Sequence, residues 1–328
     1  MEFNLNPGMF AAQPEFRPID TSKLYDVLIL GGGPAGLTAA VYCMRKGVST
    51  GILLKEIGGQ VALTAGIENY MGYRHVSGID LVARFKEQVL QFGIDYEEGA
   101  EVEGIRPGGM HVVRLADGRE IAARAIVIAT GKSWKRLNVP GEEALRGRGV
   151  AYCTTCDAPF FAGKRVAVVG GGNSGVEAAI DLARVAAEVL LVQFLDRLTA
   201  DRVLVDRLTA FSNVTMRMSH EVVRISGSGR VEAITLRDRS SGREYDLPMD
   251  GVFIEIGLMP NSAAFKDVVT LNSEGEVVID CACRTSAPGI FAAGDVTNVP
   301  FKQIIIAAGE GAKAALSACQ YVMNIRNE

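Results

Sequence analysis

The sequence lacks several features that would place it in common functional classes. Among 328 residues, 34 basic and 38 acidic side chains give a formal net charge of −4, without a basic block suited to nucleic acid. No apolar run approaches the roughly 18 residues of a membrane-spanning helix. The N-terminal residues lack the basic start and apolar run of a secretion signal. We therefore expect no nucleic-acid or membrane partner, and a cytoplasmic, reducing location.

The length and composition predict an ordinary globular protein of about two domains. Hydrophobic residues make up 48% of the chain and charged residues 22%, so there is ample apolar material for buried cores. The proline-containing, polar residues 1–24 predict a loose N-terminal arm before the first strand.

The first strong motif is "YDVLILGGGPAGLTAA", in which an apolar strand at 27–30 meets a glycine turn and an alanine-rich helix. Gly31, Gly33 and Gly36 fit the GxGxxG pattern, which allows a tight turn, close approach to a pyrophosphate and close packing of helix on strand. A second strand ends near Glu56, about 20 residues later, where an acidic ribose partner is expected. The alternative is a glycine turn in another α/β fold.

A second copy of this pattern lies in "KRVAVVGGGNSGVEAAIDLARVAAEVLLVQF". Gly170, Gly172 and Gly175 again separate a strand from a helix, and another strand follows. Two complete fingerprints predict two βαβ units and therefore two bound dinucleotides that exchange electrons.

Two further apolar strands place the second unit inside the first. One is "RAIVIATG" (124–131), which precedes the second fingerprint, and the other is "GIFAAGDV" (289–296), which follows it near the end of the chain. The predicted fold class is α/β, with two dinucleotide-binding (Rossmann-like) domains, the second inserted into the first.

Cys153 and Cys156 form a Cys-x-x-Cys pair that could be a staple, half of a metal site or a redox centre. A staple across so short a loop would contribute only about 2 kcal/mol. A zinc site would need Cys281 and Cys283 as the second pair, and their CxC spacing fits zinc poorly. In a CxxC motif, by contrast, one thiolate can be stabilised near physiological pH.

The other four cysteines are predicted to be buried core thiols. Cys281 and Cys283 lie in the strand-like run "EGEVVIDCACRTS", where residues i and i+2 share a face. Cys43 and Cys319 lie in alanine-rich segments predicted to be helices.

These motifs together resemble the flavoprotein disulfide reductases of the low-molecular-weight thioredoxin reductase type. The resemblance covers nearly the whole chain after residue 24 and rests on "GGGPAGLTAA", "GGQ" (58–60), "IENY" (67–70), "ATG", "CTTCD", "GGGNSGVEAA" and "GIFAAGDV". Within that type, "VQFLDRLTAD" and "VPFKQIIIAAGEGAKAALSA" are similar to the reductase portion of the alkyl hydroperoxide reductase flavoprotein subunit. That branch carries additional N-terminal thioredoxin-like domains, so we expect this chain to meet its redoxin as a separate protein.

The resemblance implies an FAD-binding domain at 25–136 and 262–328 and an NAD(P)H-binding domain at 137–261 that carries the CxxC. It also implies a homodimer and rotation of one domain against the other, with hinges near 134–140 and Pro260. The FAD contacts that it implies are Gly31, Gly33, Ala35, Gly36, Glu56, Gln60, Asn69, Thr130, Gly131, Gly294, Asp295, Lys302, Gln303 and Ile304. The implied nicotinamide nucleotide contacts are Gly170, Gly172, Asn173, Ser174, Gly175 and Gln193.

Asp295 also has an interpretation of its own, because it ends an apolar strand where a carboxylate can accept a hydrogen bond from a ribityl hydroxyl. Among the cysteines, the resemblance assigns Cys156 to the flavin side and Cys153 to exchange with a thioredoxin- or glutaredoxin-like protein. Asp157 then becomes the proton donor or acceptor, which requires a raised pKa. The alternative for Asp157 is a turn or helix-capping residue.

The choice of nucleotide rests on the strand end at Gln193. The NADPH-specific members carry a His-Arg-Arg cluster there, which this sequence lacks, although Arg197 is nearby. We therefore expect NADH rather than NADPH. One alternative function is a flavoprotein disulfide reductase of the same fold that uses nicotinamide nucleotides poorly and takes electrons from another donor. The others are a redox sensor without turnover and a ferredoxin–NAD(P) reductase; relatives of that last kind lack the CxxC.

Overall fold

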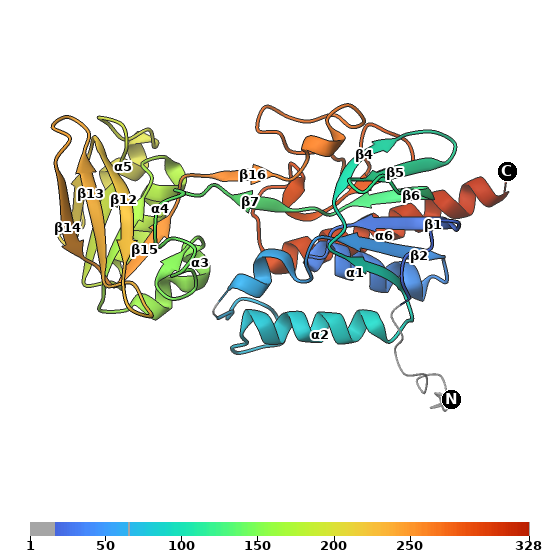
Figure 1. Cartoon of the computed structure of the whole chain (residues 1–328), viewed down its shortest axis with the longest axis horizontal. Coiled ribbons are helices and arrows are strands. Elements are labelled where there is room, and N and C mark those ends of the chain that lie inside the picture. Colours follow the sequence, from blue (N-terminus) through green and yellow to red (C-terminus); the bar gives the residue numbers. More distant parts are fainter. Residues whose placement is uncertain (1–16, 65, 328) are drawn as a thin grey trace. The chain divides into compact units, whose positions relative to one another are not determined.

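The computed structural model describes residues 17–64 and 66–327 (Figure 1). These residues divide into two compact units. Unit 1 comprises 17–63, 69–133 and 259–327, and unit 2 comprises 134–258 together with residues 64 and 66–68. The chain therefore leaves unit 1 after residue 133 and returns to it at 259, so the second unit is inserted into the first.

Unit 1 is built on a mixed sheet whose central strands are parallel and almost fully buried. The sheet order is β3 (Asp95–Glu98), β2 (Thr50–Leu54), β1 (Leu24–Leu30), β6 (Glu120–Ile128), β5 (His111–Leu115) and β4 (Val102–Arg106), with β17 (Ile290–Ala292) also paired to β6. The pairs among β3, β2, β1, β6 and β17 are parallel, whereas β6–β5 and β5–β4 are antiparallel. Burial on both faces explains why β1 and β6 end in the apolar runs 27–30 and 125–128.

Helices α1 (Pro34–Arg45) and α6 (Ile304–Asn327) pack together on this sheet, and α2 (Gly78–Leu90) begins at the capping residue Ser77. Small residues let α1 and α6 approach closely, because a Cβ added at Gly311 would overlap the carbonyl of Ala35. The same interface buries Cys43 and Cys319, whose Sγ atoms lie 3.9 Å apart. This confirms their prediction as core thiols in helices.

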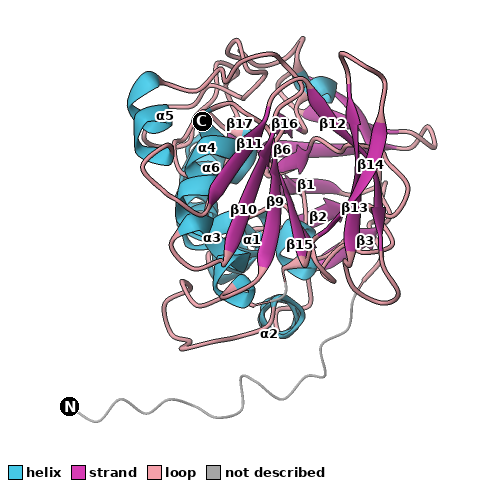
Figure 2. Cartoon of the chain, turned by 90° about the vertical axis from the view of Figure 1, so that its left-hand side faces the viewer, coloured by secondary structure: helices cyan, strands magenta, loops and turns pink. Residues whose placement is uncertain are grey.

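Unit 2 contains a five-stranded parallel sheet, part of which is seen in Figure 2. Its order is β11 (Val214–Arg217), β10 (Glu188–Val192), β9 (Arg165–Val169), β15 (Gly251–Ile254) and β8 (Val150–Ala151). A separate antiparallel sheet is made of β12 (His220–Ser226), β13 (Ala233–Asp238) and β14 (Glu244–Pro248). The helices are α3 (Thr154–Asp157), α4 (Asn173–Ala183) and α5 (Arg202–Leu208).

The remaining elements are short. Strands β7 (Lys132–Trp134) and β16 (Leu258–Pro260) pair with each other where the chain passes between the units. The 3₁₀ turns are η2 (Gly59–Leu63), η3 (Ala158–Phe161), η4 (Ala263–Phe265) and η5 (Gly294–Val296). Within the described residues, no helix is both long enough and apolar enough to cross a membrane.

The predicted fold class, two Rossmann-like domains with the second inserted into the first, is confirmed. The described part of the arm is not loose, since Ile19 is buried in the core of unit 1 and Arg17 forms a parallel β-bridge with Asp95, the first residue of β3. Residues 1–16 of that arm lie outside the described residues.

The expectation for Cys281 and Cys283 is wrong in two respects. The run is not a strand, because the side chain of Asp280 accepts hydrogen bonds from the backbone N–H groups of Ala282 and Arg284 and closes a turn. Cys283 is buried at a positive φ of 62°, but Cys281 is exposed. Only one of the two is therefore a core thiol.

Candidate active site

The glycine turn of unit 1 has the geometry that its sequence pattern predicts. Gly31 has a φ of 125°, and a Cβ there would overlap the carbonyl of Ala129 at the end of β6. A Cβ at Gly36 would overlap the carbonyl of Gly31, whereas at Gly33 it would meet nothing within 4 Å. The turn is therefore tightly packed at Gly31 and Gly36, whereas the space at Gly33 is open. Gly33 lies at the N-terminus of α1, where an anion is favoured.

Two other predicted segments lie around this turn, together with one residue that was not predicted. Gly294 in η5 lies against Ala35, since a Cβ there would be 2.9 Å from the Ala35 Cβ. The side chain of Thr130 donates to the carbonyl of Asn261 at 2.7 Å, and the Asn261 side chain donates back to the carbonyl of Thr130 at 2.8 Å. Asn261, which sequence reasoning did not assign to the site, thus holds the predicted Thr130–Gly131 segment in place.

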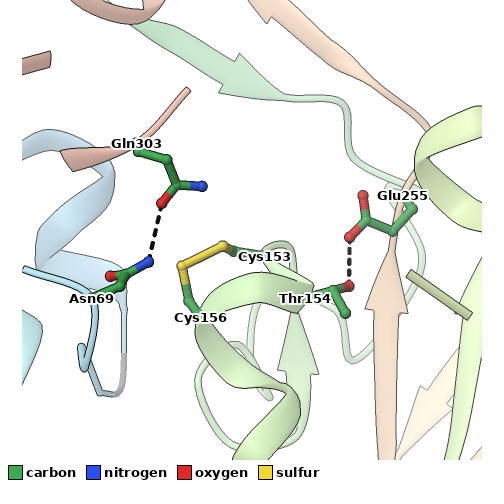
Figure 3. The surroundings of a disulfide bond; sticks show 6 residues. All are labelled: Asn69, Cys153, Thr154, Cys156, Glu255 and Gln303. Atoms are coloured by element: carbon green, nitrogen blue, oxygen red, sulfur yellow. Dashed lines mark hydrogen bonds between the residues drawn. A yellow bond between two sulfur atoms is a disulfide. The ribbon is translucent and has the colours of Figure 1, made fainter. Parts of the chain in front are cut away.

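Polar contacts also link the outer segments of the predicted FAD site. The Asn69 amide donates to the Gln303 side chain at 3.2 Å, just before α6 begins at Ile304 (Figure 3). The Gln60 side chain donates to the carbonyl of Lys132. Glu56, in contrast, is exposed two residues beyond β2, and its carbonyl packs beside Gly32.

A partly buried charge cluster lies in the same region of unit 1. Lys302 donates to the carbonyls of Thr297 and Val299 at 2.5 Å and pairs with Glu276 at 3.2 Å. Lys132 pairs with the same Glu276 oxygen at 2.5 Å. Sequence reasoning missed Lys132 and Glu276, because they are 144 positions apart and neither belongs to a motif.

Burial shifts the pKa values of two groups in this cluster. It raises the pKa of Asp295, and the positive charges of Lys302 and Lys132 oppose that shift. It lowers the pKa of Lys302, with Lys132 contributing in the same direction. The cluster therefore places two ammonium groups close enough to influence the predicted ribityl-binding carboxyl of Asp295.

The second glycine turn repeats the first in unit 2. Gly170 has a φ of 130°, and a Cβ there would overlap the carbonyl of Glu255 at the end of β15. A Cβ at Gly175 would overlap the carbonyl of Gly170, and α4 starts at Asn173 after Gly172. The sheet order places β10 on one side of β9 and β15 on the other, which is the switch point where such folds bind nucleotides.

Loop 193–201 covers this second turn. Gln193 is buried against Gly171, its side-chain oxygen accepts from the Phe194 N–H at 3.0 Å, and its amide donates to the Arg197 carbonyl at 3.1 Å. The Arg239 guanidinium lies 3.5 Å from the centre of the Phe194 ring. Asn173 and Asp201 exchange two hydrogen bonds, whereas Ser174 is exposed.

The cysteine pair lies at the start of α3 in unit 2. Cys153 and Cys156 form a disulfide with their Cα atoms 5.3 Å apart (Figure 3). Cys153 occupies the N-cap position, but its side chain makes no capping hydrogen bond. The chain then continues into η3, where Phe161 is buried edge-on against Phe253 of β15 with 4.9 Å between ring centres. This packing fixes the far end of the cysteine segment.

Two carboxyl groups near the disulfide have raised pKa values. Burial raises the pKa of Asp157, the last residue of α3, to about 6. Burial also raises the pKa of Glu255 to about 7, although hydrogen bonds from Thr154 oppose the shift. Asp157 thus meets the condition on which its predicted proton-transfer role depends, and Glu255 is a group that sequence reasoning missed.

A comparison with protein families identifies the class. The family model of the pyridine nucleotide-disulphide oxidoreductases matches residues 25–311. The chain therefore belongs to the pyridine nucleotide-disulphide oxidoreductase family and is a flavoprotein oxidoreductase with a redox disulfide.

Similar proteins refine this assignment. The chain is 48% identical over 321 residues to the F subunit of alkyl hydroperoxide reductase from Staphylococcus aureus (strain MSSA476), which covers 98% of this chain and 62% of that protein. It is 46% identical over 309 residues to the protein of the same name from Pseudomonas putida, covering 93% and 59%. The chain thus spans about six tenths of the length of the curated relatives that it matches.

Among solved structures, the chain is similar to thioredoxin reductase from Streptococcus pyogenes MGAS5005. The TM-score is 0.86 at 38% sequence identity, covering 92% of this chain and 99% of that chain. These findings confirm the resemblance inferred from the motifs.

Proposed function

We propose that the protein is a thioredoxin reductase-like enzyme. It passes electrons from a nicotinamide nucleotide through FAD and the Cys153–Cys156 disulfide to a thioredoxin- or glutaredoxin-like protein. The observation that carries the proposal is the disulfide at the start of α3, in the same unit as the second fingerprint and followed directly by the half-buried Asp157. A structural staple needs no such carboxyl group beside it.

FAD suits unit 1 because the turn is open over Gly33 and the surrounding groups offer both donors and acceptors. Backbone N–H groups at the start of α1 would hold the pyrophosphate, and the Asp295 carboxylate would accept from the ribityl chain. The Asn69 and Gln303 pair and the N-terminus of α6 would border the ring system. When bound, the flavin supplies two-electron exchange between a nicotinamide and a disulfide.

The nicotinamide nucleotide suits unit 2, and we expect NADH. The amide of Gln193 is neutral and is already engaged with the Phe194 N–H and the Arg197 carbonyl. The Arg239 guanidinium is occupied by the Phe194 ring and by the Phe194 carbonyl at 2.9 Å. Both Gln193 and Arg239 are thus engaged by other groups and not poised to bind a 2′-phosphate at this strand end. Stopped-flow flavin reduction should be faster with NADH; faster reduction by NADPH contradicts this.

The cysteines then carry out thiol–disulfide exchange. Two electrons and two protons convert the Cys153–Cys156 disulfide to a dithiol. The Cys153 thiolate attacks one sulfur of the redoxin disulfide and forms a mixed disulfide, and the departing redoxin thiolate takes up a proton. Cys156 attacks Cys153, which releases the reduced redoxin and restores the original disulfide. Asp157 is the group proposed to supply or accept the proton.

Turnover with a panel of small redoxins from the same cell tests this function. We expect NADH-driven reduction of at least one redoxin disulfide, and a loss of about 10³-fold or more in Cys153→Ser. The matched control is Cys281→Ser, which removes an exposed cysteine of unit 1 and should retain full turnover. Undiminished redoxin reduction by Cys153→Ser rejects the proposed role of the pair. Bound flavin without reduction of any disulfide favours a redox sensor.

The names of the curated relatives add a narrower candidate. Because those relatives are subunits of alkyl hydroperoxide reductases, the redoxin could be one whose own electron acceptor is an alkyl hydroperoxide. Adding an alkyl hydroperoxide to the turnover assay distinguishes the two cases. Continuous oxidation of NADH that requires both redoxin and hydroperoxide supports this candidate.

A further inference from the structure

Glu255 occupies a special position in unit 2, directly after β15 at the switch point of the sheet. Its N–H donates to the Val169 carbonyl at 2.8 Å, and its own carbonyl packs beside Gly170, the first glycine of the nucleotide turn. In unit 1 the residue with the same relation to the first glycine is Ala129, which lies beside Gly31. A small apolar residue in one unit is thus replaced by a carboxylic acid in the other.

The Glu255 side chain is bonded to the helix that carries the cysteines. The Thr154 hydroxyl donates to a Glu255 carboxyl oxygen at 2.9 Å (Figure 3). Thr154 is the first residue of α3 and follows Cys153 directly. Glu255 therefore holds the first residue of α3 through the Thr154 side chain.

The same contact places a carboxyl group against the residue that directly follows Cys153, whose thiol must ionise. A negative charge disfavours ionisation of a neighbouring thiol, and the effect is stronger where solvent is partly excluded. The acidic groups that α3 and the end of β15 bring to this region are Asp157 and Glu255. Of the two, Glu255 is the one bonded to the residue beside Cys153.

We propose that Glu255 is a positioning residue for the redox pair, which holds the first turn of α3 against the nucleotide turn and, when ionised, opposes formation of the Cys153 thiolate. The proposal rests on the proposed function of the disulfide. It adds a path of direct contacts, through Glu255 at the end of β15, between the nucleotide turn and the cysteine helix. Burial raises the pKa of Glu255 to about 7, so the carboxyl group changes charge in the neutral range.

The charge effect can be measured on the isolated thiol. In a Cys156→Ser background, the alkylation rate of Cys153 by iodoacetamide is followed against pH, and mass spectrometry of the Cys153 peptide separates it from Cys281. Glu255→Gln keeps an acceptor for Thr154 but removes the charge. We expect it to lower the midpoint of the alkylation profile by about half a pH unit or more. An unchanged midpoint overturns the charge effect.

Asp250→Asn is the matched control, because Asp250 precedes the other end of β15 and pairs with Arg165. We expect its midpoint to equal that of the Cys156→Ser parent. If it moves as much as in Glu255→Gln, the effect is not local to Glu255 and the charge effect is again overturned. Retained flavin absorbance and circular dichroism verify that each variant is folded.

The anchoring role has a separate readout. Glu255→Ala, which copies Ala129, removes the charge and the anchor together. This experiment uses the chain that keeps both Cys153 and Cys156. We expect the disulfide to be reduced more slowly in Glu255→Ala than in Glu255→Gln. Equal rates of disulfide reduction in the two variants overturn the anchoring role. The thiol titration uses no redoxin, so it gives a result even if the redoxin turnover that tests the proposed function fails.

Discussion

The two glycine turns share a backbone but differ in the side chains that surround them. Gly31 and Gly170 have φ values of 125° and 130°, and each is packed under a carbonyl at the end of the neighbouring parallel strand. The residue that provides this carbonyl is Ala129 in unit 1 and Glu255 in unit 2. The turn in unit 1 therefore lies beside a residue that cannot ionise, whereas the turn in unit 2 lies beside an ionisable residue that is hydrogen-bonded to the cysteine helix.

This difference shows how a repeated fold acquires separate tasks. The backbone requirements of a dinucleotide turn are met in the same way twice, because tight turns and helix packing leave no room for a Cβ. The chemistry is added at the strand ends, where the side chain does not affect the turn itself. In unit 1 those ends carry Thr130, Gly131 and Asp295, and in unit 2 they carry Gln193 and Glu255.

The largest expected effect comes from adding a methyl group to each turn separately. Gly31→Ala and Gly170→Ala each place a Cβ against a carbonyl at a positive φ. We expect Gly31→Ala to lose bound flavin, and Gly170→Ala to keep flavin but raise the KM for the nicotinamide nucleotide by about tenfold or more. Flavin absorbance and steady-state kinetics measure the two effects. Loss of flavin in both variants, or in neither, contradicts the assignment of one nucleotide to each unit.

A smaller effect is expected at Asp157, which has no counterpart in unit 1. Its pKa of about 6 leaves a protonated fraction that declines as the pH rises above that value. If Asp157 donates the proton, redoxin turnover should decline over the same range. Asp157→Asn should lower turnover by about 10- to 100-fold and remove that limb of the pH profile. If Asp157→Asn retains both the turnover rate and the decline at higher pH, Asp157 is not the proton donor.

Glu255 should make stability depend on pH in one direction. Its folded pKa of about 7 exceeds the ordinary value of 4.5, so the folded state holds a proton that the unfolded state has already lost. Stability is therefore lost as the pH rises from about 4.5 to 7. Relative to wild type, Glu255→Gln should gain roughly 2 kcal/mol between pH 5 and pH 8, measured by denaturant unfolding. If the difference in unfolding free energy between Glu255→Gln and wild type is the same at pH 5 and at pH 8, the raised pKa of Glu255 is contradicted.

His111 in unit 1 should give the opposite dependence and the smallest effect. It is buried in β5 beside Gly289, and burial lowers its pKa. The unfolded state then takes up a proton first, so stability is lost as the pH falls through the ordinary value of 6.5. His111→Gln should reduce this loss of stability at acidic pH, which unfolding curves recorded at several pH values measure. An equally steep decline in the variant assigns the acid sensitivity to other groups.

The sequence predicted the parts of this structure that depend on local spacing. Both fingerprints, the inserted second domain and the cysteine pair follow from short motifs and their order. The Cys281–Cys283 run was predicted wrongly, because alternating apolar residues indicated a strand while the Asp280 side chain closes a turn. Glu255, Lys132 and Glu276 could not be predicted, since their contacts join positions about 100 or more residues apart.

The most direct test of the central claim is an anaerobic titration of the flavin-loaded enzyme with NADH. If electrons pass through the flavin to the disulfide, the enzyme takes up about two molar equivalents of NADH, one for each two-electron centre. Cys153 and Cys156 should then become alkylatable, which mass spectrometry of their shared peptide detects. Uptake of about one equivalent, with the flavin reduced and the disulfide intact, would contradict the account.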